Sequence, residues 1–144
     1  MPDQEPIPPP APSGPGSELG PNSTSTGLPS NVAAAIACIP LIGGVVFYIL
    51  EKHDGFVRFY AMQSIIFGGA WLLFNIASSV VHVVFGAIPG IGGLLVFFWA
   101  IIAALIHIAF LVVWIVATIK AFTGVRWDIP YIGPMARKQV ETVP

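Results

Sequence analysis

Three long apolar runs constrain the fold of this chain more than any other feature. Residues 31–50, 59–85 and 94–121 contain no Asp, Glu or Arg, and their only Lys is Lys120, near the end of the third run. A helix needs about 20 apolar residues to cross a hydrocarbon core roughly 30 Å thick, and each run reaches that length. Large apolar side chains occupy every side of each run, without the polar stripe of a soluble helix. We therefore predict an all-α, polytopic membrane protein with three transmembrane helices, in a domain that spans residues 31–124.

The composition agrees with a body that lies in the lipid bilayer. Hydrophobic residues make up 56% of the 144 residues and charged residues only 9%, whereas soluble domains average roughly 25% charged residues. The net charge of −1 provides no field that would attract nucleic acid, so we expect no nucleic-acid partner. The single cysteine, Cys38, excludes an internal disulfide and a multi-cysteine metal site. We predict neither a cofactor nor a bound metal.

The segment before the first run is rich in proline. Residues 1–30 hold nine of the 14 prolines and few large aliphatic side chains. Such a segment buries too little apolar surface to offset the entropy lost on ordering. We predict a disordered N-terminal tail over residues 1–30. Its PxxP spacings leave two alternatives open, a solvated tether and a ligand for an aromatic groove.

The first run contains its own helix breakers. Pro40 lacks an amide donor, and Gly43 with Gly44 loosens the following turn, so we expect a kink near the middle of residues 31–50. A complete break would make this run a re-entrant hairpin that does not cross the membrane. Both alternatives remain open from the sequence.

Polar side chains mark one face of the second run. Asn75, Ser78, Ser79 and His82 are spaced i, i+3, i+4 and i+7, which places them on one side of a helix. His107 lies near the middle of the third run, at a depth similar to that of Asn75, about 20 Å from the charged side at 1.5 Å per residue. Polar groups are costly in lipid, so these side chains should contact protein or water. They serve either as interhelical hydrogen bonds or as the lining of a path for a solute.

The same residues do not predict an enzyme. An intramembrane hydrolase that used Ser78 or Ser79 would need a histidine base in contact with it and a group that orients this histidine. His82 and His107 are the candidate bases, but the apolar runs contain no carboxylate to orient either one.

The basic residues predict the orientation in the membrane. Lys52 and Arg58 follow the first run and four more basic residues lie at or after residue 120, whereas residues 1–30 and 86–93 contain none. The positive-inside rule makes the basic side cytoplasmic. In a bacterial inner membrane, three crossings then leave the N-terminus outside and the C-terminus in the cytoplasm. A re-entrant first run would place both termini in the cytoplasm.

Residues 125–144 mix aromatic and basic side chains, which is typical of an interfacial or cytoplasmic segment. Gly133 and Pro134 disfavour a long helix there. Residues 51–64, EKHDGFVRFYAMQS, hold a second candidate, an interfacial motif of Arg58, Gln63 and Ser64. We expect Arg58 to lie at the headgroups or to bind a lipid phosphate, and Gln63 and Ser64 to connect helices just inside the bilayer.

This motif resembles a family of small, largely uncharacterised bacterial membrane proteins. That family is related to the twenty-kilodalton inner-envelope (Tic) component of chloroplast protein import. The shared elements are residues 40–43, 51–52 and 56–64 and the closing stretch 122–133, and Tyr60 stands where the family usually has His. The resemblance covers about residues 30–137. It implies a helical membrane protein with a remote relation to protein translocation, and it supplies no catalytic residues.

The sequence supports two functions. We favour a structural or assembly subunit, present as a homo-oligomer or within a larger membrane-protein complex. Its contacts would use the small-residue pairs Ala33/Ala37 and Ala100/Ala104 together with the polar face of the second run. The alternative is an oligomeric channel or carrier for a small solute, since three helices alone hardly enclose a pore.

Overall fold

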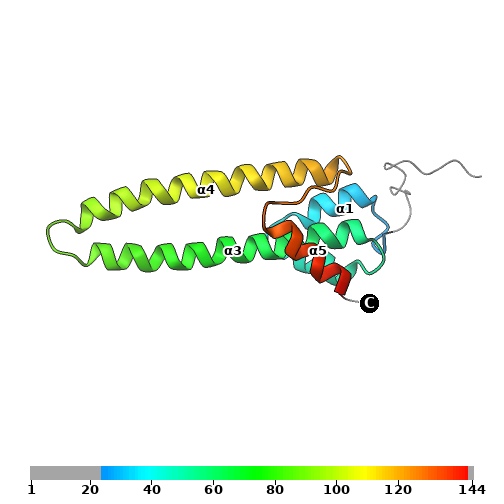
Figure 1. Ribbon diagram of the computed structural model, residues 1–144, viewed down its shortest axis with the longest axis horizontal. Coiled ribbons are helices and arrows are strands. Elements are labelled where there is room, and N and C mark those ends of the chain that lie inside the picture. Colours follow the sequence, from blue (N-terminus) through cyan, green and yellow to red (C-terminus); the bar gives the residue numbers. More distant parts are fainter. Residues whose placement is uncertain (1–23, 143–144) are drawn as a thin grey trace, which may run out of the picture.

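The computed structural model describes residues 24–142, which form five helices. Figure 1 shows two of them as a long hairpin, with α1 and α5 gathered at one end. We call this end the packed end and the opposite end, with residues 87–91, the hairpin end. The helices are α1 (Ser30–Ala37), α2 (Ile42–Leu50), α3 (Gly55–Gly86), α4 (Gly92–Phe122) and α5 (Ile132–Thr142).

Within the described residues, α3 and α4 are the two helices long and apolar enough to cross a membrane. They contain 32 and 31 residues, so each is more than 40 Å long at about 1.5 Å per residue. Because this exceeds a hydrocarbon core of about 30 Å, the hairpin tilts or extends beyond the core. The predicted spans 59–85 and 94–121 lie inside these two helices.

The first apolar run forms two short helices that fold back on each other. α1 ends at Ala37, α2 begins at Ile42, and Leu41 between them has a φ of +61°. The chain before α1 lies beside the end of α2, since Ser25 donates hydrogen bonds to Glu51, the C-cap residue of α2. Ser30, the first residue of α1, donates to Asp54, the N-cap residue of α3. The expectation of three transmembrane helices is therefore not confirmed: the break at residues 38–41 reverses the chain, and the described residues contain two candidate spans, α3 and α4. This reversal agrees with the re-entrant alternative.

Two glycines let this α1–α2 hairpin approach α3 closely. A Cβ atom on Gly44 would lie 2.7 Å from the carbonyl oxygen of Ala61, and one on Gly68 would lie 2.7 Å from the backbone nitrogen of Leu41. Only a residue without a Cβ fits at such contacts. The reversal at Leu41 is thus packed directly on the middle of α3.

The main hydrophobic core lies at the packed end. Its fully buried members include Ala33 and Ala37 of α1, Tyr60 of α3 and Ala121 of α4. The pair Ala33/Ala37, which we expected to contact another protein, is therefore used inside the chain's own fold. By contrast, the helices carry many exposed large apolar side chains, such as Leu105, which is 62% exposed. This distribution suits a helical hairpin surrounded by lipid.

The two ends of the described chain lie at the packed end. Most of the predicted tail, residues 1–30, lies outside the described residues, but Leu28 packs against the core. α5 also packs against α3. Gly133 and Pro134 do not prevent α5, because they lie in its first turn, where amide groups have no helical partner. The expectation that the two termini lie on opposite sides of the membrane stays a prediction.

Candidate functional site

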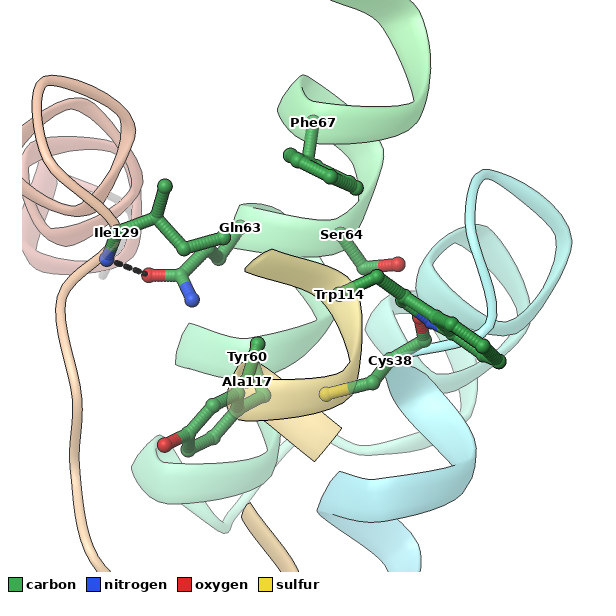
Figure 2. Close-up of a pocket in the computed structure, with 8 residues that line it drawn as sticks. All are labelled: Cys38, Tyr60, Gln63, Ser64, Phe67, Trp114, Ala117 and Ile129. Atoms are coloured by element: carbon green, nitrogen blue, oxygen red, sulfur yellow. Dashed lines mark hydrogen bonds between the residues drawn. The ribbon is translucent and has the colours of Figure 1, made fainter. Parts of the chain in front are cut away.

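The motif of residues 56–64 forms a buried hydrogen-bond network on α3. The Tyr60 hydroxyl donates to the carbonyl oxygen of Val125 (2.6 Å) and accepts from the backbone N–H of Trp127 (3.0 Å). The Gln63 side chain accepts from the N–H of Ile129 (3.2 Å), as Figure 2 shows, and donates to the carbonyl oxygen of Trp127 (3.4 Å). These bonds fix the irregular segment that connects α4 to α5.

The same region of α3 and α4 also supports the break between α1 and α2. Ser64 Oγ donates to the carbonyl oxygen of Ile39 (3.0 Å), and Trp114 Nε1 donates to that of Cys38 (2.8 Å). Carbonyl groups at the end of a helix have no helical donor, and leaving them unpaired in lipid is costly. The backbone N–H of Gly44 also donates to the carbonyl oxygen of Ile39 (3.3 Å). Ser64, Trp114 and Gly44 together therefore supply donors to the carbonyl groups of the break.

These side chains surround a cavity of only about 10 Å³. This volume is at the lower limit for one water molecule. Figure 2 shows the lining residues, which are Cys38, Tyr60, Gln63, Ser64, Phe67, Trp114, Ala117 and Ile129. The network is consequently a clamp that holds chain segments together, with no room for a larger ligand.

Arg58, the remaining member of the predicted motif, lies apart from the clamp. Its guanidinium group is 5.2 Å from the centre of the Tyr48 ring of α2. Arg126 lies over the Phe59 ring at 5.3 Å. Both contacts have the geometry of cation–π pairs, so these arginines hold their charge beside aromatic rings at the packed end.

Glu51 ties the beginning of the described chain to the loop before α3. Its buried carboxylate accepts hydrogen bonds from the backbone N–H of Ser25 (2.7 Å) and from the Ser25 hydroxyl (2.9 Å). It also accepts from the backbone N–H groups of His53 (3.0 Å) and Asp54 (3.1 Å). Burial raises the pKa of Glu51, but these hydrogen bonds outweigh it, so the pKa lies below its ordinary value.

The second candidate region is a polar groove between α3 and α4, between the middle of the hairpin and the hairpin end. Its volume is about 510 Å³. The structure brings all five of the predicted polar side chains to this one surface, together with three alanines of α4. The lining residues are Asn75, Ser78, Ser79, His82, Ala100, Ala103, Ala104 and His107.

Asn75 of α3 and His107 of α4 lie in direct contact across this groove. Asn75 Oδ1 lies 3.3 Å from His107 Nε2. Asn75 Nδ2 donates to the carbonyl oxygen of Trp71 on its own helix (2.8 Å), and His107 Nδ1 lies 2.7 Å from that of Ala103. The equal depth expected from the sequence is consistent with this direct contact.

The other polar side chains of the groove bond to α4 or to their own backbone. Ser78 Oγ accepts from Trp99 Nε1 of α4 (3.0 Å), and Ser79 Oγ donates to the carbonyl oxygen of Asn75 (2.8 Å). His82 Nδ1 lies 2.8 Å from the carbonyl oxygen of Ser78. Hydrogen bonds of this kind stabilise a helix and its packing against a neighbouring helix. The role of Trp99 was missed from the sequence, because its spacing relative to Ser78 depends on how the two helices align.

Within residues 24–142, no group of three or more His, Cys, Asp and Glu side chains is placed to hold a metal ion. The groove contains two imidazoles, an amide and two hydroxyls, all of which can form hydrogen bonds with a polar molecule.

Comparison with known proteins gives the family. Residues 23–136 match the MamF/MmsF family, described as the magnetosome magnetite crystal formation protein family. A UPF0132 membrane protein of Methanocaldococcus jannaschii is 36% identical over 117 residues, which cover 80% of this chain and 92% of the relative. A UPF0132 membrane protein of Archaeoglobus fulgidus is 33% identical over 115 residues, with coverages of 78% and 97%. No solved structure matches.

These matches overturn the resemblance to the chloroplast import component. The family match and the relatives all point to MamF/MmsF and UPF0132 proteins, and the elements at residues 40–43 and 56–64 belong to that family's matched region. The relatives are archaeal, so the expected bacterial inner membrane stays a prediction. Their names agree with the two apolar helices in indicating a membrane location. The chain is thus a membrane protein that belongs to the MamF/MmsF family.

Proposed function

We propose that this chain is a structural subunit of a membrane assembly and that copies of it associate through the α3–α4 groove. The observation that carries this proposal is the composition of the groove, which combines polar side chains with the exposed small residues Ala100 and Ala104. Small residues let a helix of a neighbour approach closely, and polar groups in lipid are stabilised when protein covers them. An association through this groove satisfies both requirements.

The comparisons support a role within the membrane. The relatives are described as membrane proteins, without a stated activity, and the family description names magnetite crystal formation in magnetosomes. We propose that this chain, like these relatives, acts within a membrane. In a host that forms magnetosomes, we propose that the assembly contributes to magnetite crystal formation.

We also propose an orientation for the assembly. All six Lys and Arg residues lie at the packed end or next to it, whereas the loop of residues 87–91 has none. The positive-inside rule then places the packed end in the cytoplasm and the hairpin end on the opposite side. Residue 24 and α5 would both face the cytoplasm.

The association is tested by measuring the mass of the full chain in a mild detergent by light scattering. We expect an oligomer for the wild type and a smaller species for Ala104→Leu, because the larger side chain fills the groove. Leu105→Phe adds volume at an exposed position outside the groove and serves as the matched control. A monomeric wild type, or equal masses for wild type and Ala104→Leu, would contradict the proposal.

The Asn75–His107 contact favours a second candidate, an oligomeric channel or carrier in which several grooves line a solute path. This candidate predicts solute flux in vesicles that contain only this protein. The flux should be lost in Asn75→Leu and in His107→Leu and kept in Leu105→Phe. If the wild type is oligomeric but its vesicles show no solute flux, the result would instead favour the structural subunit.

A further inference from the structure

Two arginines lie at the ends of the spanning helices. Arg58 is the fourth residue of α3, and Arg126 follows the last residue of α4, Phe122, by four positions. Nη2 of Arg126 lies 3.8 Å from the place that a Cβ atom on Gly55 would occupy, so its guanidinium group lies against the first turn of α3. A bilayer is about 40–45 Å thick with its headgroups, which is close to the length of these helices. Both arginines therefore lie at the level of the headgroups.

The chain provides these two arginines with no ion pair. Within residues 24–142, the one ion pair joins Arg137 to Asp128. Glu51 and Asp54, the carboxylates nearest to Arg58 in sequence, accept hydrogen bonds from hydroxyl and backbone N–H groups instead. The Nε–H group of Arg58 is buried and has no hydrogen-bond partner among the described residues. A buried donor of a charged group is costly without an acceptor, so Arg58 calls for an anion from outside the chain.

Aromatic rings position both guanidinium groups. That of Arg58 lies 5.2 Å from the centre of the Tyr48 ring, and that of Arg126 lies 5.3 Å from the centre of the Phe59 ring. A ring covers one face of a guanidinium group, whereas the N–H donors point outwards in its plane. This planar fork of donors matches the oxygens of a phosphate group. Each arginine can thus bind a phosphate while it stays on its ring.

The beginning of α3 adds positive charge at the same place. A helix N-terminus carries a partial positive charge, which favours anions and disfavours cations. Asp54 supplies a carboxylate there as the N-cap residue, but two guanidinium groups and the exposed Lys52 lie beside the same turn or in the loop before it. A bound phosphate would offset this excess of positive charge.

We infer that Arg58 and Arg126 bind the phosphate group of an anionic phospholipid in the leaflet at the packed end. Exposed apolar side chains next to Tyr48 favour a lipid over a free phosphate. Ile49 is 64% exposed and Leu50 is 52% exposed, and both can contact acyl chains, which a free phosphate lacks. The inference does not depend on association through the groove.

The inference is tested by native mass spectrometry of the full chain in detergent, with added phosphatidylglycerol or phosphatidylcholine. Both lipids carry a phosphate, but phosphatidylcholine also carries a cationic group. We expect the wild type to bind phosphatidylglycerol more tightly. Arg58→Gln and Arg126→Gln should each weaken this binding about tenfold, since charge-assisted hydrogen bonds are lost. Lys138→Gln removes an exposed basic charge of α5 and is the matched control, which should bind as the wild type.

A conservative variant separates the recognition of phosphate from a general loss of structure. Arg58→Lys keeps the charge without the planar fork, so it should bind phosphatidylglycerol more weakly than the wild type and more tightly than Arg58→Gln. Equal affinities of the wild type for the two lipids, or equal losses in Arg58→Gln and Lys138→Gln, would overturn the inference. Displacement of the lipid by an equal concentration of inorganic phosphate would also overturn it, because the site would then recognise a free anion.

Discussion

Gly68, in the middle of α3, lies directly against the backbone of Leu41, the residue at which the chain reverses between α1 and α2. This contact places the turn of the α1–α2 hairpin on a spanning helix. Ser64, one turn earlier on α3, donates to the carbonyl oxygen of Ile39 in the same turn. Close packing and a paired carbonyl together stabilise a chain reversal that lipid alone would not solvate.

Gly68→Ala should destabilise the protein, because the added Cβ would lie 2.7 Å from the backbone nitrogen of Leu41. Overpacking of this kind costs about 1–3 kcal/mol. Gly69→Ala is the matched control, since a Cβ there meets nothing within 4 Å, and alanine is the better helix former by about 1 kcal/mol. Thermal unfolding in mild detergent should show a lower midpoint for Gly68→Ala and an unchanged or higher one for Gly69→Ala. Equal midpoints would show that the turn does not pack on α3.

Tyr60→Phe should loosen the segment between α4 and α5. The substitution keeps the ring but leaves the N–H of Trp127 and the carbonyl oxygen of Val125 without their partner. Each buried group left unpaired costs about 1–3 kcal/mol. Limited trypsin digestion should cleave the variant faster after Arg126, whereas Tyr131→Phe, at a residue that is 90% exposed, should match the wild type. A cleavage rate unaffected by Tyr60→Phe would argue against the clamp.

Glu51 should make stability depend on pH. Its pKa is lowered in the folded protein, so its contribution is fully present above the ordinary value of about 4.3 and is lost as pH falls through the folded pKa. Glu51→Gln should be less stable than the wild type at neutral pH, and the difference should shrink in acid. Thermal midpoints measured from neutral to acidic pH give this difference directly. Glu141→Gln, at an exposed position in α5, should show no such trend, and a wild type that parallels Glu51→Gln at every pH would exclude the effect.

Much of the fold follows from the sequence, because it depends on local hydrophobicity. The apolar runs 59–85 and 94–121 became α3 and α4, which extend them by a few residues. The helical spacing from Asn75 to His82 predicted one face, and one groove contains these residues. Both predictions use the period of the helix and the cost of polar groups in lipid.

The course of the first run could not be predicted in the same way. Pro40, Gly43 and Gly44 indicate a break, but whether the chain kinks or reverses depends on distant partners. The reversal is held by Gly68, by Trp114 and by the hydrogen bonds between Ser25 and Glu51. These contacts join residues far apart in the sequence, so a local pattern does not reveal them.

Labelling of single cysteines shows directly whether the chain crosses the membrane twice, through α3 and α4. In a Cys38→Ala background, Thr24→Cys, Ala87→Cys and Glu141→Cys are each exposed to a membrane-impermeant maleimide on sealed vesicles of known orientation. With two spans, Thr24→Cys and Glu141→Cys should react from one side and Ala87→Cys from the other. A Thr24→Cys that reacts from the same side as Ala87→Cys would show instead that residues 31–50 cross the membrane.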